Sequence, residues 1–501
     1  MKVKLNVTKK SLAEMKHLVV VAPEMFYADG KILKKELPRS CHFLLSDLSK
    51  FKSGTKGAKI ESFVDDKRIE KVSLIVLPDE VSRSNSRTRK YFTDQLLSSL
   101  IDVTKESCGL WIVLEEKAHI DAMAASVARQ LKDVSYKTAF SESKNSESKK
   151  SKKSSSRKTT LSIAFTDLDG RTVKATAKTE ALVDSVRWSM ALVDTAPSEL
   201  NPEKFSLEIK KRFLGNSAVK FSEIVGKDLV KEKLGGIWAV GKTAVKRPRL
   251  VCLRYKPKGI KQPKKIALAG KGVTYDTGGL NLKVGGSMAG MKADMGGAAA
   301  VVSAFDHLVK SGSCRNEVIA VVGLVENAIG PEAYKPDDIV TMHSGKTVEI
   351  NNTDAEGRLV LGDCVSWVAR KFSPSVIVDA ATLTGAQLVA TGLHHAALVC
   401  SDDELEKKAV ETGHATGDMV CPLPFAPDVH LSEFDSVVAD MKNSVKNRGN
   451  AQTSCAGLFI YSQISDLPKI KYLHVDLAGP AVGADGRGTG FGTHLLSKLC
   501  H

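Results

Sequence analysis

The sequence predicts an α/β protein with two three-layer domains, a smaller N-terminal one and a larger C-terminal one. At 501 residues, the chain is too long for one ordinary hydrophobic core. Its composition, 43% hydrophobic and 26% charged residues, is typical of a globular protein. In both halves, short apolar runs rich in β-branched residues alternate with segments whose apolar residues recur at helical spacing. This alternation indicates helices layered on a sheet.

The N-terminal domain is expected over residues 1–175 with a substantially parallel sheet. Its predicted strands are 18–22, 72–77, 110–114 and 161–165, and its predicted helices are 88–103 and 119–131. Residues 141–158 are a low-complexity Ser/Lys/Glu segment, which predicts a loop that cannot bury apolar surface. No catalytic motif is found in this part of the chain.

A linking helix is expected over residues 176–198. The helical pattern runs from 179 to 193 and stops near Pro197, because proline disfavours the helical conformation of the residue before it. Asn201 and Pro202 then suit the start of a further helix over 202–213.

The C-terminal domain is expected over residues 199–501. Its predicted strands are 250–255, 265–269, 317–324, 375–379 and 472–476, and its predicted helices are 296–310 and 358–371. Lys271 and Asp379 are expected just after two of these strands. Ligands of open α/β sheets bind at the carboxyl ends of strands, so this edge is the expected site.

One glycine pattern imitates a nucleotide-binding motif. Gly236-Ile-Trp-Ala-Val-Gly-Lys-Thr243 matches the phosphate-binding P-loop. That loop works between a buried strand and a helix. The residues before it are too polar for the strand, and Pro248 with a strand-like run follows it, so no helix is expected to begin at Lys242. ATP binding is therefore disfavoured.

Two stretches rich in carboxylates, lysines and glycines, 271–294 and 351–359, indicate a metal site. They carry Asp276, Asp294, Asp354 and Glu356. Oxygen ligands suit hard or borderline divalent cations, and two ions held a few Å apart need shared carboxylates. If residues 354–356 are extended, both acidic side chains leave the same face. A helix starting near Gly357 would point its positive end into the cluster. The alternatives are ordinary Asp/Gly turns and exposed salt bridges.

These stretches resemble the metal-binding sequence of the leucyl (cytosol) aminopeptidase family. The octapeptide Asn352-Thr-Asp-Ala-Glu-Gly-Arg-Leu359 is diagnostic of the family, and the Lys271, Asp276, Lys283, Asp294 series has its spacing. The resemblance extends from about Asp194 to the end. It also covers the segments that begin at Tyr334, Asp379, Ala439 and Gly488. Tyr275-Asp-Thr replaces the commoner Phe-Asp-Ser, so the sequence most resembles an animal subgroup described as probable aminopeptidases.

The resemblance implies a metal-dependent aminopeptidase that releases leucine-like N-terminal residues through a water activated by two metals. It implies a C-terminal catalytic domain with a mixed sheet flanked by helices. Asp276 and Glu356 would bridge two divalent ions, Zn²⁺ or Mn²⁺ with Mg²⁺ as a further option. Lys271 and Asp294 would complete one ion's ligands, and Asp354 the other's. A neutral Lys271 amine is reasonable beside two dications in a buried site.

The same resemblance assigns residues that hold no metal. Lys283 would stabilise the oxyanion. Arg358 would hold a bicarbonate ion as general base, against the alternative of a structural bridge to Asp354 or Glu356. Met291, Thr382 and Gly385 would line the pocket for the N-terminal side chain, although Met291 also suits a plain core position. The family implies peptide substrates with a free N-terminus and a homohexamer, a dimer of trimers.

Other features limit the remaining classes of function. Nine scattered cysteines are expected to be reduced, which favours the cytoplasm. No apolar run is long enough to span a membrane, and the start lacks the features of a signal peptide. The net charge of +16 lies largely in local runs such as 149–158 and 256–265, without aromatic residues to stack bases. Only weak, non-specific nucleic-acid binding is therefore expected.

Three further hypotheses are less favoured: a histidine zinc site, a serine hydrolase and a non-catalytic binding protein. His394 and His395 are expected to be structural because the His-Glu-x-x-His pattern is absent, and a serine hydrolase lacks its Gly-x-Ser-x-Gly motif. A non-catalytic binding protein that keeps the fold is the main rival to an enzyme. The complete ligand set with Lys283 and Arg358 argues against it, because drift would be expected to damage at least one of these positions.

Overall fold

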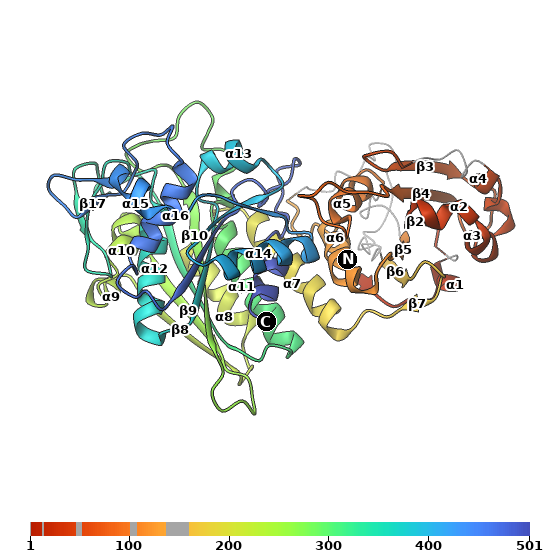
Figure 1. Cartoon of the computed structure of the whole chain (residues 1–501), viewed down its shortest axis with the longest axis horizontal. Helices are drawn as coiled ribbons and strands as arrows, with labels where there is room; N and C mark the ends of the chain where they lie inside the picture. The colour runs from red at the N-terminus through yellow and green to blue at the C-terminus, as the bar shows by residue number, and fades with distance from the viewer. Residues whose placement is uncertain (1, 13–14, 47–52, 101–107, 137–159) are drawn as a thin grey trace, which may run out of the picture. The chain divides into compact units, whose positions relative to one another are not determined.

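A computed structural model describes residues 2–12, 15–46, 53–100, 108–136 and 160–501 (Figure 1). The predicted loop at 141–158 lies outside these residues. The chain divides into two compact units, one of Met1–Val81 with Arg89–Thr176 and one of Ser82–Thr88 with Ala177–His501. Both units combine helices with a sheet, so the predicted α/β class and its two-domain arrangement are confirmed.

The first unit is built on a seven-stranded sheet with the order β1-β6-β5-β2-β4-β3 and with β7 paired to β6. The β1-β6, β6-β5, β5-β2 and β2-β4 pairs are parallel, as predicted, whereas β3 and β7 pair antiparallel. The strands are β1 (Lys2–Lys4), β2 (His17–Pro23), β3 (Ala58–Phe63), β4 (Lys71–Leu77), β5 (Cys108–Val113), β6 (Thr160–Thr166) and β7 (Thr172–Val173).

Six short helices of the described residues accompany this sheet: α1 (Lys9–Leu12), α2 (Glu24–Asp29), α3 (Lys31–Glu36), α4 (Phe43–Ser46), α5 (Lys90–Ser98) and α6 (Ile120–Arg129). The two longest, α5 and α6, confirm the predicted helical segments. Apolar side chains from β2, β4 and β5, among them Val20, Leu74 and Trp111, form the core with residues of α2 and α3.

The second unit is built on a mixed eight-stranded sheet with the order β16-β15-β18-β14-β10-β11-β9-β8. Its centre, β18-β14-β10-β11, is parallel, and β15 and β9 join it antiparallel. The strands are β8 (Val219–Val225), β9 (Arg249–Tyr255), β10 (Lys265–Asp276), β11 (Glu317–Asn327), β14 (Val376–Ala381), β15 (Ala396–Cys400), β16 (Val420–Pro422) and β18 (Lys471–Asp476). A small sheet joins β12 (Ile339–Thr341), β13 (Thr347–Glu349) and β17 (Met441–Lys442).

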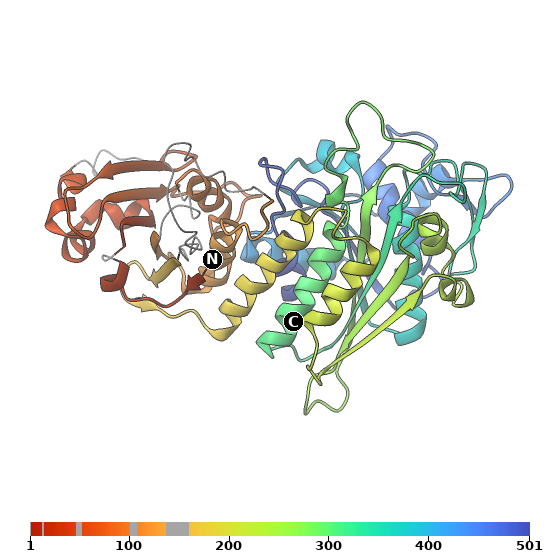
Figure 2. The same ribbon diagram turned by 180° about the vertical axis from the view of Figure 1, so that it is seen from behind.

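Helices cover both faces of the large sheet. Successive residues of a strand face opposite sides, so a strand that is apolar throughout offers apolar side chains to helices on both faces. In β10, Leu268 packs in the core under α11, while Ala267 and Ala269 pack in the core under α12. Figure 2 shows α7, α8 and α11 side by side on one face. The helices are α7 (Ala177–Asp194), α8 (Pro202–Arg212), α9 (Asp228–Lys231), α10 (Gly235–Gly241), α11 (Gly296–Ser311), α12 (Gly357–Phe372), α13 (Gly385–Thr391), α14 (Asp403–Thr416), α15 (Pro427–His430), α16 (Gln452–Ser462) and α17 (Thr493–Leu499).

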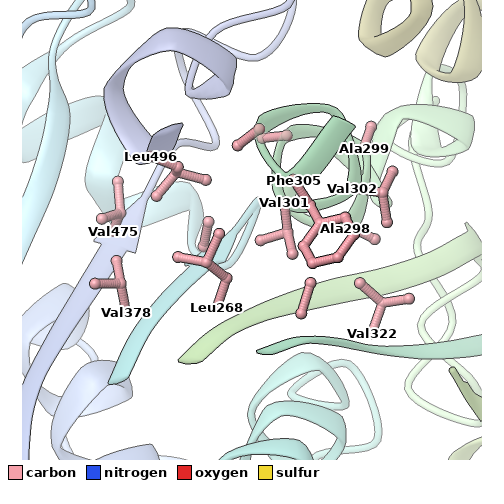
Figure 3. Close-up of a cluster of buried hydrophobic side chains, with 14 of the residues drawn as sticks. Leu268, Ala298, Ala299, Val301, Val302, Phe305, Val322, Val378, Val475 and Leu496 are labelled. Atoms are coloured by element: carbon pink, nitrogen blue, oxygen red, sulfur yellow. The ribbon is translucent and has the colours of Figure 1, made fainter. Parts of the chain in front are cut away.

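Small residues bring α11 close to the centre of the sheet. Ala298, Val301 and Phe305 of this helix pack over Leu268 and its neighbours (Figure 3). A Cβ atom at Gly297 would lie 2.1 Å from the carbonyl oxygen of Ala380 in β14. Only glycine permits this approach, which places the start of α11 beside the carboxyl ends of β10 and β14.

Strands β10 and β14 are longer than predicted. Lys271 lies inside β10, which ends at Asp276, and Asp379 lies inside β14, so the expected positions just after a strand are wrong for both. The glycines that suggested a break permit close packing instead. A Cβ atom at Gly270 would lie 2.7 Å from the Cα atom of Ala298 in α11.

The glycines of the P-loop-like pattern lie in a helix. Residues 236–241 belong to α10, which follows the short helix α9 rather than a strand. A Cβ atom at Gly236 would lie 2.6 Å from the carbonyl oxygen of Leu359, and one at Gly241 would lie 2.5 Å from Pro248. The pattern therefore serves helix packing, and the phosphate-binding loop is not formed.

No helix among the described residues is long and apolar enough to cross a membrane.

Candidate metal centre

Three acidic side chains from separate segments meet near the carboxyl ends of the parallel strands. Asp276 is the last residue of β10, Asp294 precedes α11, and Glu356 is the N-cap residue of α12. A carboxylate oxygen from each lies within 4.8 Å of the others. The three residues are 3%, 8% and 2% exposed, respectively. Carboxylates so close and so buried require positive charge among them.

Lys271 supplies part of that charge from within β10. Its Nζ atom lies 2.5 Å from Asp294 Oδ1 and 3.0 Å from Glu356 Oε1, and donates to the carbonyl of Thr382 at 2.8 Å. Burial alone would lower the pKa of Lys271, but the surrounding carboxylates outweigh it and raise this pKa. Gly357 is needed beside it, because a Cβ atom there would lie 2.4 Å from Lys271 Cε.

Lys283 reaches the cluster from the loop after β10. Its Nζ atom lies 2.8 Å from Asp276 Oδ2 and also contacts Asp354 Oδ1. Despite the opposing effect of burial, Asp276 and Asp354 raise the pKa of Lys283. The loop turns at Gly278, where φ is +84° and the backbone N–H donates to Asp276 Oδ1 at 2.9 Å. The 16% exposure of the Lys283 side chain distinguishes it from Lys271, whose side chain is 3% exposed.

Two oxygens of the cluster have no hydrogen-bond partner. Asp294 Oδ2 and Glu356 Oε2 are both buried and unpaired. Burial, together with the charge of Asp276, raises the pKa of Glu356 to about 8. Burial likewise raises the pKa of Asp294 to about 6, although Lys271 opposes the shift. Unpaired buried carboxylate oxygens with raised pKa values are suitable ligands for divalent cations, so the residues fit the expected metal centre.

The segment that carries Asp354 and Glu356 is a turn and not extended, so the condition under which both acidic side chains would leave the same face is not met. The backbone N–H of Ala355 donates to the carbonyl of Asn352 at 3.1 Å, and Glu356 has helical angles, φ −70° and ψ −38°. Asn443 holds the turn by donating to the Asn352 carbonyl at 2.7 Å. Asp354 is more exposed than Glu356, with side-chain exposures of 34% and 3%.

Arg358 is a buried cation with unused donors. It is 4% exposed, and its Nε and Nη1 atoms have no hydrogen-bond partner. No ion pair joins it to the nearby Asp354 or Glu356 among the residues described, so the structural-bridge alternative is not supported. Its guanidinium carbon lies 5.9 Å from the ring centre of Phe434. Burial lowers the pKa of Arg358 to about 10, and an anion bound to its free donors would compensate for the lost hydration.

The three predicted pocket residues lie on different parts of this region. Thr382 Oγ1 donates to Asp294 Oδ1 at 2.9 Å, so it touches the carboxylate cluster directly. Met291 is half-buried at the start of the short turn before Asp294. Gly385 begins α13 and lines a cavity of about 490 Å³ whose described lining contains neither Met291 nor Thr382.

Several supporting residues were not predicted. Asn327, the last residue of β11, pairs in register with Asp276 and donates to its Oδ1 at 2.8 Å. Asn327 also donates to the carbonyl of Thr353 at 3.1 Å, and Tyr334 donates to the same carbonyl at 2.6 Å. A polar residue at the end of an apolar run was the available signal for Asn327. The contacts of Tyr334 had no signal in the sequence.

The histidines and cysteines are not part of the centre. His395 Nε2 lies 2.8 Å from the carbonyl oxygen of Ser84, which ties the segment Ser82–Thr88 to the second unit. None of the nine cysteines, all of which lie within the described residues, belongs to a disulfide, as predicted, and eight of them are buried.

Comparison with known proteins identifies the family to which this sequence and fold belong. Residues 187–497 match the model of the cytosol aminopeptidase family, catalytic domain. The human protein named probable aminopeptidase NPEPL1 is 41% identical over 433 residues, which cover 85% of this chain and 79% of that protein. Leucine aminopeptidase 1 of Caenorhabditis elegans is 38% identical over 433 residues, covering 86% and 84% of the two chains.

Solved structures agree with these sequence relatives. Leucyl aminopeptidase from Trypanosoma cruzi superposes with a TM-score of 0.87 at 34% identity, covering 100% of this chain and 96% of that one. The Trypanosoma brucei leucyl aminopeptidase solved in complex with bestatin gives a TM-score of 0.86 at 33% identity, covering 98% and 93%. Similarity on this scale extends beyond the catalytic domain to both units.

Proposed function

Because the chain belongs to the cytosol aminopeptidase family and is a metal-dependent aminopeptidase, we propose that it releases leucine-like residues from peptides with a free N-terminus. The proposed centre holds two divalent ions, Zn²⁺ or Mn²⁺, with Mg²⁺ as a further option. The observation that carries this proposal is the group of buried carboxylates in which Asp294 Oδ2 and Glu356 Oε2 lack partners.

Five residues would hold the metals. We assign Asp276 and Glu356 as bridging ligands, Lys271 and Asp294 to one ion, and Asp354 to the other. When bound, the ions would polarise the scissile carbonyl, anchor the free amine of the substrate and acidify a water molecule. Lys271 must lose its proton to become a ligand. Its ammonium now contacts Asp294 and Glu356, so metal binding would replace this internal cation.

Lys283 is suited to stabilise the negative charge that develops on the carbonyl oxygen. Its ammonium is oriented by Asp276 and Asp354 and retains 16% exposure, so it has access to substrate. A preoriented cation beside the developing charge is worth about 10²–10³ in rate. We therefore assign Lys283 to the oxyanion and not to a metal.

Arg358 is suited to hold an anion at the start of α12. Its Nε and Nη1 donors lie on different edges of the guanidinium and lack acceptors, which the oxygens of a bound anion would supply. We propose bicarbonate as this anion, which would supply a general base for the attacking water. Met291, Thr382 and Gly385 are proposed to contact the N-terminal side chain.

The remaining parts of the proposal concern the whole chain. Catalysis is assigned to residues 199–501, with 176–198 as a linking helix before them. We propose a homohexamer, a dimer of trimers, in the cytoplasm, and expect nucleic-acid binding to be no more than weak and non-specific.

The test is hydrolysis of leucine para-nitroanilide by the purified chain after chelation and after addition of Mn²⁺ or Zn²⁺. We expect the chelated protein to be inactive and either ion to restore turnover. A fully folded, metal-loaded protein that releases no chromophore from this or any other free aminoacyl anilide would reject the proposed function.

A further inference from the structure

An apolar cavity of about 490 Å³ lies against the N-terminus of α13. Its apolar walls come from α13 and from the segment after β16. Its polar side comes from residues 448–449 and 451–454, and none of the described residues that line it is acidic. The lining residues are Gly385, Ala386, Val389, Ala390, Leu423, Pro424, Arg448, Gly449, Ala451, Gln452, Thr453 and Ser454.

This cavity lies close to the carboxylate cluster. Thr382 accepts a hydrogen bond from Lys271 and donates one to Asp294, and Gly385 of the cavity wall is three residues further along the chain. Three residues span at most about 10 Å. The Thr384 and Thr453 hydroxyls, 3.1 Å apart, join the two sides of the wall. A peptide bound at the metal centre would therefore reach the cavity within one or two residues.

Arg448 is the only charged residue of this lining, and it has no carboxylate partner among the residues described. Its loop is nevertheless held in place. Glu433 accepts hydrogen bonds from the backbone N–H of Asn447 at 2.8 Å and from the side chain of Asn450 at 2.7 Å. The Asn447 side chain accepts from the N–H of Gly449 at 2.9 Å. The loop thus carries an unpaired guanidinium on a fixed backbone at the cavity.

We propose that Arg448 makes this cavity a subsite for a substrate carboxylate, so that the enzyme favours peptides carrying a negative charge near the scissile bond. The inference rests on the proposed function, because it places the peptide at the metal centre. An arginine fork without a carboxylate partner binds a carboxylate with directed hydrogen bonds, and the exposure of Arg448 lets a substrate reach it.

The carboxylate can come from three places in a peptide, and matched substrates separate them. Glutamyl and glutaminyl anilides differ in charge at the first residue. Leu-Glu-amide and Leu-Gln-amide differ at the second residue. Leu-Gly and Leu-Gly-amide differ at the C-terminus. For each pair, the ratio of kcat/KM between the charged and the neutral member is measured in the wild type, Arg448→Gln and Arg448→Glu.

We expect the ratio for at least one pair to fall about five- to tenfold in Arg448→Gln and further in Arg448→Glu. Lys446→Gln is the matched control, because it removes the same charge from the same loop at a residue outside the cavity lining. Its ratios should stay at the wild-type values.

Two results would overturn the inference. One is that all three ratios are unchanged in both Arg448 variants, and the other is that Lys446→Gln lowers them equally. Either result leaves the proposed function intact if the metal-loaded wild type cleaves the neutral substrates. If the wild type cleaves none of the substrates, the proposed function fails and the subsite fails with it.

Discussion

The two unpaired oxygens of Asp294 and Glu356 are the most informative atoms of this chain. A buried carboxylate oxygen without a partner is costly, and most buried polar atoms in proteins avoid that state. The same cluster contains two lysines whose ammonium groups already touch its carboxylates. Lys271 and Lys283 are therefore similar in charge, and their different burial separates the roles proposed for them.

Substitution of single residues should separate metal binding from catalysis. Glu356→Ala removes a proposed bridging carboxylate, so we expect loss of metal together with loss of activity. Lys283→Ala should retain both metals and lose turnover by about 10²-fold or more. Elemental analysis of the two purified variants, paired with anilide hydrolysis, is the measurement. Loss of metal from Lys283→Ala would show that this lysine has been assigned to the wrong role.

Asn327 should act on the metals through Asp276. It fixes one oxygen of that carboxylate, and outer contacts of this kind commonly change metal affinity by about 10–100-fold. We expect Asn327→Ala to weaken metal binding by this factor, measured by competition with a chelator. Asn316→Ala is the control, because Asn316 lies beside the opposite end of β11 and contacts the Cys500 carbonyl. Wild-type affinity in Asn327→Ala would contradict the supporting role.

At the level of elements, glycines explain where sequence reasoning succeeded and where it failed. The apolar run ending at Ala269 correctly predicted a strand, but the glycines after it concealed that β10 continues to Asp276. Their close contact with α11 becomes visible only when both elements are in place. The start of α12 at Gly357 was predictable because apolar spacing and the acidic residues before it agreed.

The helix α10 provides a test of this packing account. Gly236→Ala would place a Cβ atom 2.6 Å from the Leu359 carbonyl oxygen, which belongs to the backbone and cannot move aside easily. We expect a loss of about 1–3 kcal/mol in the free energy of unfolding, measured by urea denaturation. Lys242→Ala, at the lysine of the P-loop-like pattern, should change stability by less than about 0.5 kcal/mol. Equal stability of the two variants would contradict the close contact.

Strand β2 should make stability depend on pH through His17. Burial, assisted by Lys71, lowers the pKa of His17 to about 4 from the ordinary value of 6.5. Between these values the unfolded chain binds the proton and the folded chain does not, so stability rises with pH from 4 to 6.5. We expect His17→Gln to reduce this rise by about 2 kcal/mol. The free energy of unfolding is measured in urea at pH 4, 5 and 6.5, with hydrogen exchange in β2 and β4 as a local readout. If its dependence on pH were the same in His17→Gln and the wild type, the assignment to His17 would be contradicted.

For the whole molecule, the sequence predicted the fold class and which residues form the carboxylate cluster. It did not predict how those residues are arranged in space. The octapeptide at 352–359 and the spaced lysines and aspartates identified the candidate ligands. The turn around Asp354, the support from Asn327 and the cavity beside Arg448 were not predicted. Each depends on segments distant in the chain, such as β10 with β11 or α13 with the loop after β17, whose pairing no local pattern encodes.

The central claim is that the metals hold the free amine of a peptide while its first bond is cleaved. The most direct measurement compares Leu-Gly-Gly with N-acetyl-Leu-Gly-Gly on the metal-loaded protein, with product release followed by chromatography. An acetylated nitrogen is a poor metal ligand, so we expect cleavage of the free peptide and a rate at least about 10²-fold lower for the blocked one. The chelated protein should cleave neither. Comparable turnover of both peptides would contradict the account.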